Sequence, residues 1–439
     1  MSRSPDPIPA ASPAGRRRRP ARGGVRSDER ALAPDLARGG MLLLIVLSNT
    51  VFHLWAAEYG PSGWHPVGGS ALDAAVRFVM ITMLDLRAYP LFAFLFGYGL
   101  MRLYQRQIAA GAAPADAVAL LRRRGLWLVG FGFAHAALLM AGDIVGAYGL
   151  ASLLLVPLFV RRRDRTLVVA VCVASGVVVA TMLAPAVWAI AGGNLGQLGD
   201  PSGTGPTAVV YASGEPHWPA AAGTRLGTWS FVTVLGGLLS FGGHSMMLLG
   251  FLAARHGVLE EPHRYLPLLR RTALLGVATG WLGGLPAALA HAGALEVPAA
   301  AVAEEGALRL LQEATGLAGG LGYVAVFALV AQWISVRGRR GPVVRAVAAA
   351  GQRSLSCYLA HSALFAPVLA AWGLGLGGHL NSAGMAAFAT GVWLVTVAGA
   401  AELDRRGLPG PAEALLRRLV YGRTMRRTTP PPALPHQNG

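Results

Sequence analysis

The sequence has no lysine, only two cysteines and little charge of either sign. Of its 439 residues, 13% are charged and 54% are hydrophobic, and all 38 basic residues are arginine. A typical soluble domain carries about 25% charged residues, so the composition argues against that class and indicates a polytopic membrane protein. Cys172 and Cys357 both lie inside apolar runs, which excludes a disulfide framework and a thiolate metal site.

Familiar catalytic motifs are also absent. The sequence contains no HExxH, no Walker A loop, no GxSxG elbow and no Cys or His pair at metal-ligand spacing, so we expect neither a metal nor a permanently bound cofactor. The formal charge of +17 could suggest nucleic acid, but the arginines form short clusters between apolar runs. This pattern indicates membrane topology, with the lipid bilayer as partner and no nucleic acid.

Ten apolar runs approach the length of roughly 20 residues that a spanning helix needs. They lie near residues 41–57, 86–104, 125–141, 144–160, 166–192, 229–254, 270–292, 315–335, 346–371 and 384–402. We therefore predict an all-α, polytopic integral membrane protein with about ten transmembrane helices. Residues 71–85 are too short and too charged to span, and they predict an interfacial or re-entrant helix.

The arginine distribution predicts the orientation. Cytoplasmic loops of membrane proteins are enriched in basic residues. With the N-terminus inside, the outer segments hold only Arg77, Arg87, Arg225 and Arg309, and every other arginine falls on the inner side. We expect both termini to be cytoplasmic and the protein to be a multi-pass component of the inner (plasma) membrane.

The chain divides into two halves around a long Gly/Pro-rich loop. The predicted parts are a disordered Arg/Pro/Ala-rich cytoplasmic tail (1–39), an N-terminal five-helix half (40–192), an extracytoplasmic loop (193–228), a C-terminal five-helix half (229–404) and a basic cytoplasmic tail (405–439). Small-xxx-small spacings, such as Gly316 with Gly320, predict close helix packing.

The first apolar run carries a polar stripe. Arg38 and Asn49 are eleven residues apart, about three helical turns, so they share a face, and His53 lies one turn beyond Asn49. Polar residues inside a membrane usually face a bundle interior or a wet cavity. The stripe therefore indicates a substrate path, or alternatively a snorkelling arginine with an asparagine that bonds another helix.

Two ionisable residues lie in "RRRGLWLVGFGFAHAALLMAGDIVGAYG". His135 falls close to mid-bilayer, where it can serve as a general base or stay neutral, bonded to a carbonyl. Asp143 falls at the turn into the next run, where it can cap that helix or pair with an outer arginine such as Arg87. Arg87 itself can bind an anion, pair with Asp85 or Asp143, or anchor the interface. His361 lies in a later run and is either a core histidine or part of a site.

Four blocks, "LARGGMLLLIVLSNTVF", "YPLFAFLFGYGL", "RRRGLWLVGFGFAHAALLMAGDIVGAYGL" and "GQRSLSCYLAHSALF" through "LLRRLVYG", occur in order with characteristic spacing. Together they resemble the YeiB-like bacterial membrane proteins, a family of unknown function, over roughly residues 35–425. That family is similar to the wider transmembrane acyltransferases, which include the acyltransferase-3 and heparan-glucosaminide acetyltransferase types.

The resemblance implies about ten helices and transfer of an acyl group from cytoplasmic acyl-CoA, the donor substrate, to a small-molecule, glycan or lipid-linked acceptor outside. Arg38-Gly39 matches the Arg-Gly pair that opens an early helix in those enzymes. Asn49 stands where the acyltransferase-3 group has a histidine, so the usual base is absent; the glucosaminide-type and YeiB-like proteins also have Asn there.

Under this resemblance His135 is the substitute base or acyl carrier, and Asp143 and Asn49 complete the catalytic group. Asp143 would orient the acceptor or a histidine. Arg38, Arg87, His53 and His361 would bind substrate. The phosphates of coenzyme A would meet three consecutive arginines, Arg122, Arg123 and Arg124, which the positive-inside rule also explains without a ligand.

Two other functions fit the same residues. In a secondary transporter the polar stripe would line a permeation path, with broken helices at matched places in two inverted repeats. In a non-catalytic envelope scaffold the polar residues would bond one another or the backbone, with no cavity beside them. The sequence does not decide whether the protein is an enzyme.

Overall fold

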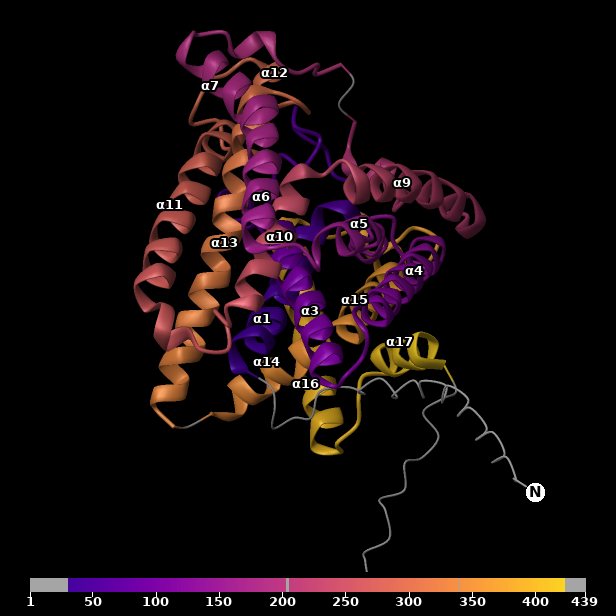
Figure 1. Cartoon of the computed structure of the whole chain (residues 1–439). Coiled ribbons are helices and arrows are strands. Elements are labelled where there is room, and N and C mark those ends of the chain that lie inside the picture. The colour runs from indigo at the N-terminus through magenta and orange to yellow at the C-terminus, as the bar shows by residue number, and fades with distance from the viewer. Residues whose placement is uncertain (1–30, 203–204, 339, 423–439) are drawn as a thin grey trace, which may run out of the picture.

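The computed structural model describes residues 31–202, 205–338 and 340–422, and within these ranges the fold is all helical and has no β-strand (Figure 1). The first half contains α1 (Leu32–Ser48), α2 (Ala71–Val79), α3 (Ala88–Ala109), α4 (Pro114–Leu138), α5 (Ile144–Phe159), α6 (Asp164–Val178) and α7 (Ala184–Ala191). The rest contains α8 (Thr207–Val210), α9 (Trp218–Leu238), α10 (Phe241–Arg255), α11 (Leu266–His291), α12 (Ala299–Val302), α13 (Ala307–Val336), α14 (Pro342–Gln352), α15 (Ser354–Leu369), α16 (Ser382–Arg405) and α17 (Pro411–Tyr421).

Several of these helices suit a membrane. In the described ranges six helical segments are long and apolar enough to cross one, or seven if the bent pair α9 and α10 forms a single span. The outward faces are apolar as well: on α11, Leu274 and Leu282 are 71% and 66% exposed. Exposed side chains of this kind, along a whole helix, indicate contact with lipid rather than water. The predicted all-α class with several candidate spans is confirmed, whereas the predicted number of about ten transmembrane helices is not.

Two predicted runs are each divided into two helices. The run 229–254 breaks between α9 and α10, which are bent by 52°. Ser240 starts a new helix there, since its hydroxyl accepts a hydrogen bond from the backbone N–H of Gly243 at 3.2 Å. The run 346–371 breaks at Arg353, whose backbone is not helical and whose guanidinium donates to the Asp404 carboxylate and the Leu408 carbonyl.

Other predicted spans are short. The apolar part of α4 begins only at Gly125, after three arginines, and α5 and α15 each have 16 residues. The short helix predicted over 71–85 is present as α2, which continues in the π-helical turn Met80–Leu84.

The chain ends differ from the predicted boundaries. Helix α1 begins at Leu32, inside the predicted tail 1–39, because Leu32 and Leu36 are buried against the bundle. The rest of that tail, residues 1–30, lies outside the described residues, as do residues 423–439 of the C-terminal tail. The described part of the C-terminal tail includes α17, which contacts α4 and α15.

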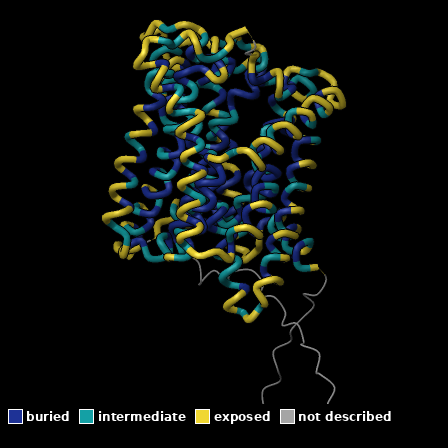
Figure 2. Tube along the Cα trace, turned by 45° about the horizontal axis from the view of Figure 1, so that its top comes forward, coloured by how far each residue is buried: buried dark blue, intermediate teal, exposed yellow. Residues whose placement is uncertain are grey.

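The helices form two flanks around a central group. In Figure 1, α11 and α13 lie on one flank, α4, α5 and α9 lie on the other, and α1, α3, α6 and α10 lie between them. Buried residues fill the interior between the flanks (Figure 2). We call the end that carries α7 and α12 the outer end, and the end that carries α14 and α17 the inner end.

Glycines allow α11 and α13 to touch backbone to backbone. A Cβ on Gly276 would lie 2.5 Å from the carbonyl oxygen of Ala318, and a Cβ on Gly280 would lie 2.7 Å from the Cα of Gly319. The predicted pair Gly316 and Gly320 meets the start of α3, where added Cβ atoms would lie 2.4 Å from the Leu86 carbonyl oxygen and 2.6 Å from the Pro90 side chain. Small residues at such contacts are what membrane helices use to approach closely.

Replacing Gly276 should therefore separate α11 from α13. We expect Gly276→Ala to lower the free energy of unfolding by about 1–3 kcal/mol, since an inserted methyl forces the backbones apart. Thermal unfolding in detergent would measure the loss. Gly399→Ala on α16 is the matched control, because its added Cβ would meet nothing within 4 Å. Equal melting temperatures for the two variants would contradict this account of the interface.

Candidate functional site

A cavity of about 360 Å³ lies at the outer end of the molecule. Its walls come from the loop before α2, the turn before α3, the end of α11 and the first turns of α13. Small-molecule sites commonly have volumes of about 300–1,000 Å³. The cavity, which we call the outer cavity, is therefore large enough for a small ligand.

Its floor holds a buried histidine–aspartate pair. His65 Nε2 lies 2.6 Å from Asp85 Oδ2, and both side chains are almost fully buried. With Nε2–H donating to the carboxylate, His65 Nδ1 is left as an acceptor, and it has no hydrogen-bond partner in the described part of the chain. A carboxylate that fixes the tautomer of a histidine in this way is the arrangement that general bases use.

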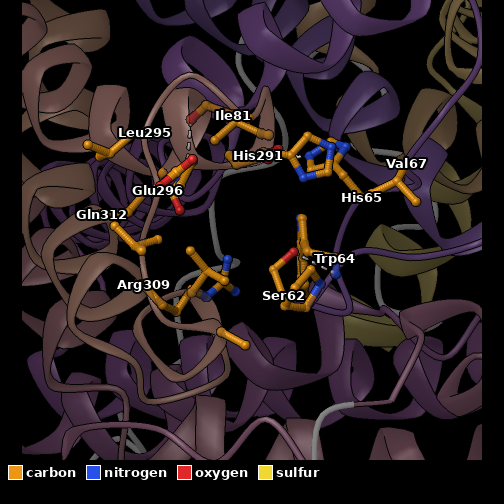
Figure 3. A pocket seen from close by; sticks show the side chains of 18 residues that line it. Ser62, Trp64, His65, Val67, Ile81, His291, Leu295, Glu296, Arg309 and Gln312 are labelled. Carbon is orange, nitrogen blue, oxygen red and sulfur yellow. Dashed lines mark hydrogen bonds and ion pairs between the residues drawn. The ribbon is translucent and has the colours of Figure 1, made fainter. Parts of the chain in front are cut away.

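Two charged or polar groups flank the pair (Figure 3). His291, at the end of α11, stands beside His65 with ring centroids 5.9 Å apart, and its Nε2 lies 3.0 Å from the Pro66 carbonyl oxygen. Opposite them, the Arg309 guanidinium points into the cavity and lies 4.5 Å from the ring centre of Trp64. Arg309 has no ion-pair partner among the described residues.

The segment that carries Asp85 has an unusual backbone. It follows the π-helical turn Met80–Leu84, and Leu86 has φ of 62°, a conformation that is uncommon for a residue other than glycine. Both features are enriched at functional sites. Together they direct Asp85 toward His65.

Long polar side chains hold this backbone in place. Arg87, which is fully buried, donates from its guanidinium to the carbonyls of Ile81, Asp85 and Gly280. Gln312 Nε2 donates to the Ile81 carbonyl at 2.8 Å, and the Tyr323 hydroxyl donates to the Met83 carbonyl at 2.5 Å. Carbonyls that a π-turn frees are thus satisfied by side chains, as buried backbone groups require. Arg87, predicted to bind substrate, is committed here to backbone carbonyls.

A second cavity, of about 320 Å³, lies at the inner end, and we call it the inner cavity. Its lining includes five arginines, namely Arg38, Arg102, Arg106, Arg124 and Arg417. Its other side reaches apolar residues of α1 and α3, among them Met41, Phe92 and Phe96. The polar part of the lining also contains three acidic residues, Asp35, Glu260 and Glu413, so the arginines outnumber the acids five to three.

The arginines of the inner cavity differ in how they are bonded. Arg102 Nε lies 2.6 Å from Glu260 Oε1, and Arg38 contacts both the Asp35 carboxylate and the Leu95 carbonyl. Arg124 and Arg417 have no hydrogen bond or ion pair with other described residues. Burial raises the pKa of Tyr421 on α17, and the charges of Arg124, Arg106 and Arg417 nearby oppose that shift. These arginines consequently form one positive cluster.

The three consecutive arginines do not act together. Only Arg124 lines the inner cavity. Arg123 donates to the Val420 carbonyl of α17 at 3.1 Å, and Arg122 is exposed. A helix turns about 100° per residue, so neighbouring residues point in different directions.

His135 and Asp143, both predicted as catalytic residues, contact each other in the structure. His135 Nδ1 lies 3.1 Å from Asp143 Oδ1, and both side chains are completely buried. Asp143 Oδ2 also accepts from the Gly146 N–H at 2.6 Å, so it caps α5. His135 Nε2 has no partner among the described residues, and none of the cavities described in this section includes His135.

The remaining predicted residues are dispersed. Asn49 is half-buried and forms no hydrogen bond with His135. His53 is buried, and neither ring nitrogen has a hydrogen-bond partner among the described residues. It lines a cavity of about 10 Å³, room for roughly one water molecule. His361 Nε2 lies 2.9 Å from the Thr396 hydroxyl, as in a core histidine. In the described ranges, no group of three His, Cys, Asp or Glu residues could hold a metal.

The bonds of Arg87 predict a strong effect of its removal. Arg87→Ala removes a side-chain donor from three buried carbonyls, of which only that of Ile81 keeps another, Gln312. Each group left unsatisfied costs about 1–3 kcal/mol. We expect the free energy of unfolding to fall by about 3 kcal/mol or more, measured by thermal unfolding in detergent. Arg309→Ala, which removes an arginine that donates to no carbonyl of the described residues, is the control and should cost much less. A smaller loss for Arg87→Ala than for the control would refute the assignment.

Comparison with known proteins gives one match. A family model described as a protein of unknown function (DUF418) matches residues 253–423, which extend from the end of α10 through α17. No curated protein and no solved structure matches the chain. The segment 253–423 is therefore similar to the DUF418 family, and it contains the last of the YeiB-like sequence blocks.

Proposed function

We propose that this multi-pass membrane protein is an acyltransferase that takes an acyl group from cytoplasmic acyl-CoA and delivers it to a glycan or lipid-linked acceptor outside. The observation that carries the proposal is the two-sided lining of the inner cavity, with arginines on one side and Met41, Phe92 and Phe96 on the other. Coenzyme A has the same two parts, because its phosphates are anionic and its acyl-pantetheine arm is largely apolar.

The donor would bind with its phosphates on Arg124 and Arg417. These side chains have no protein partner among the described residues, so their guanidinium groups are available to phosphate oxygens. Arg38 would contribute charge from α1, where the resemblance places the Arg-Gly pair. A volume of about 320 Å³ accommodates only part of coenzyme A, so the adenosine end would remain outside.

His135 is assigned to the transfer step because its partner Asp143 caps α5, and α5 also contacts the apolar lining of the inner cavity. Phe92, on the apolar side of the inner cavity, stacks on Tyr148 of α5 with ring centroids 4.8 Å apart. Asp143 caps the same helix about 7.5 Å further along its axis and holds His135. Phe96 stacks on Tyr148 as well, with ring centroids 5.6 Å apart, so both aromatic residues of the apolar lining contact the helix that Asp143 caps.

The reaction would then follow acyl-transfer chemistry. His135 Nε2 accepts the proton of the acceptor hydroxyl or amine as that oxygen or nitrogen attacks the thioester carbonyl carbon. The carbon–sulfur bond breaks, the acyl group stays on the acceptor, and the leaving thiolate takes up a proton to give free coenzyme A. Asp143 stabilises the imidazolium that forms in between.

Acetyl-CoA binding tests the donor site. Purified protein in detergent should be stabilised by RT ln(1 + [L]/Kd), about 1.4 kcal/mol when the ligand is at about ten times its Kd. Arg124→Gln should weaken the affinity about tenfold or more, since bonds to charged groups contribute about 1.5–3 kcal/mol. Thermal shift titrations measure both quantities.

The neighbouring arginine supplies the control. Arg122→Gln removes the same charge from an exposed position outside the cavity and should bind like the wild type. His135→Gln should also retain binding, because His135 is assigned to transfer. No stabilisation at millimolar acetyl-CoA in folded protein, or equal losses for Arg122→Gln and Arg124→Gln, would rule out this donor site.

The proposal also requires the inner end to face the cytoplasm, with both termini there. In a background without Cys172 and Cys357, we expect His217→Cys, on the exposed outer loop, to react with an impermeant maleimide in intact cells. Arg337→Cys, at the inner end, should react only after permeabilisation. The reverse labelling pattern would invert the topology and remove acyl-CoA as donor.

A further inference from the structure

The outer cavity has no role in the proposed transfer, yet its groups are arranged as a ligand site. The His65–Asp85 pair, His291 and Arg309 come from four separate segments and converge on one space of about 360 Å³. Each of these side chains contacts a protein neighbour: His65 contacts Asp85, His291 contacts the Pro66 carbonyl, and Arg309 stacks on Trp64.

Arg309 supplies a cation that the protein does not neutralise. It stacks on Trp64 and has no ion-pair partner in the described ranges. A stacked guanidinium keeps its N–H edge free for a planar, two-point contact with a carboxylate or phosphate. The arrangement therefore favours an anionic group in the cavity.

The acidic residues nearby do not oppose this. Asp85 is bonded to His65 through Oδ2, and its Oδ1 is buried without a hydrogen-bond partner among the described residues, so it can accept from a ligand hydroxyl. Glu296, which also lines the cavity, is exposed. His65 Nδ1 is a second acceptor on the floor, so it can also receive a hydrogen bond from a hydroxyl group. Apolar wall residues, among them Ile81, Ala287 and Val302, would cover the carbon skeleton.

We propose that the outer cavity binds a small, water-soluble organic anion that also carries a hydroxyl group. Arg309 binds the carboxylate or phosphate, and His65, held by Asp85, accepts the hydroxyl hydrogen bond. The site is independent of acyl-CoA binding at the inner end, so either one can exist without the other.

Chemical modification of histidines provides the test. Purified full-length protein in detergent is treated with diethyl pyrocarbonate, and the modification rates of His65 and His291 are read by peptide mass spectrometry. The probes are lactate and glycerol 3-phosphate, which carry an anion and a hydroxyl, and glycerol, which carries only hydroxyls. His217 is the internal control, because its side chain is 82% exposed and lies outside the cavity.

We expect at least one anionic probe to slow modification of the cavity histidines about tenfold at about ten times its Kd, while glycerol has no effect. Arg309→Gln should lose this protection and Arg309→Lys should weaken it, with His217 modified normally in both. Arg337→Gln removes another arginine stacked on a tryptophan, Trp333 at 3.7 Å, and should leave protection unchanged.

Three results would overturn the proposal. The first is that neither anionic probe protects at millimolar concentration; the second is that protection persists in Arg309→Gln. The third is that the cavity histidines are protected only by phosphatidylglycerol added to the micelles, which would mean that a lipid headgroup, and not a soluble anion, occupies the cavity.

Discussion

The buried guanidinium of Arg87 fixes the geometry on which the outer end depends. In an apolar interior each unsatisfied carbonyl is costly, and a π-turn followed by a left-handed residue leaves several of them without helical donors. Arg87 reaches the carbonyls of Ile81, Asp85 and Gly280, and so joins the turn before α3 to the middle of α11. The glycines of α11 and α13 make room for it: a Cβ on Gly284 would lie 2.3 Å from its guanidinium. Helix packing and the position of Asp85 therefore have one common cause.

The two cavities are built alike but carry different charged groups. Each is formed where helices separate near an end of the bundle, and each combines an apolar wall with charged groups that come from distant parts of the sequence. The inner cavity accumulates positive charge from α1, α3, α4 and α17, whereas the outer cavity places one arginine opposite a histidine–aspartate pair. This asymmetry suits different ligands at the two faces of a membrane.

Features formed by residues close in the sequence could be predicted from the sequence. The glycine contacts of Gly316 and Gly320 followed from their four-residue spacing, and a helix cap was one of the two roles that the sequence suggested for Asp143. Its contact with His135 did not follow from the spacing, since only the family resemblance suggested that Asp143 orients a histidine. The outer cavity could not be predicted in the same way, because His65 and His291 are brought together only by packing of α11 against the loop before α2. One signal for the outer cavity was available in the sequence, because Arg309 is one of only four arginines on the predicted outer side. The break at Ser240 was not predicted either, because the apolar run continues through it. Only the hydrogen bond from the Gly243 N–H to the Ser240 hydroxyl shows that a new helix begins there.

The short distance between the two cavities affects how a membrane potential would act on the protein. Asp85 lines the outer cavity and Phe92 the inner one, and seven residues of largely helical chain span on the order of 10 Å, about a third of a bilayer core. Where water enters from both faces, a membrane potential falls mainly across the thin layer between them. A unit charge crossing the whole potential changes energy by about 2.3 kcal/mol per 100 mV, so a charge that moves through this layer would experience most of that energy over a few ångströms. With water in both cavities, the transmembrane field would therefore act on the start of α3.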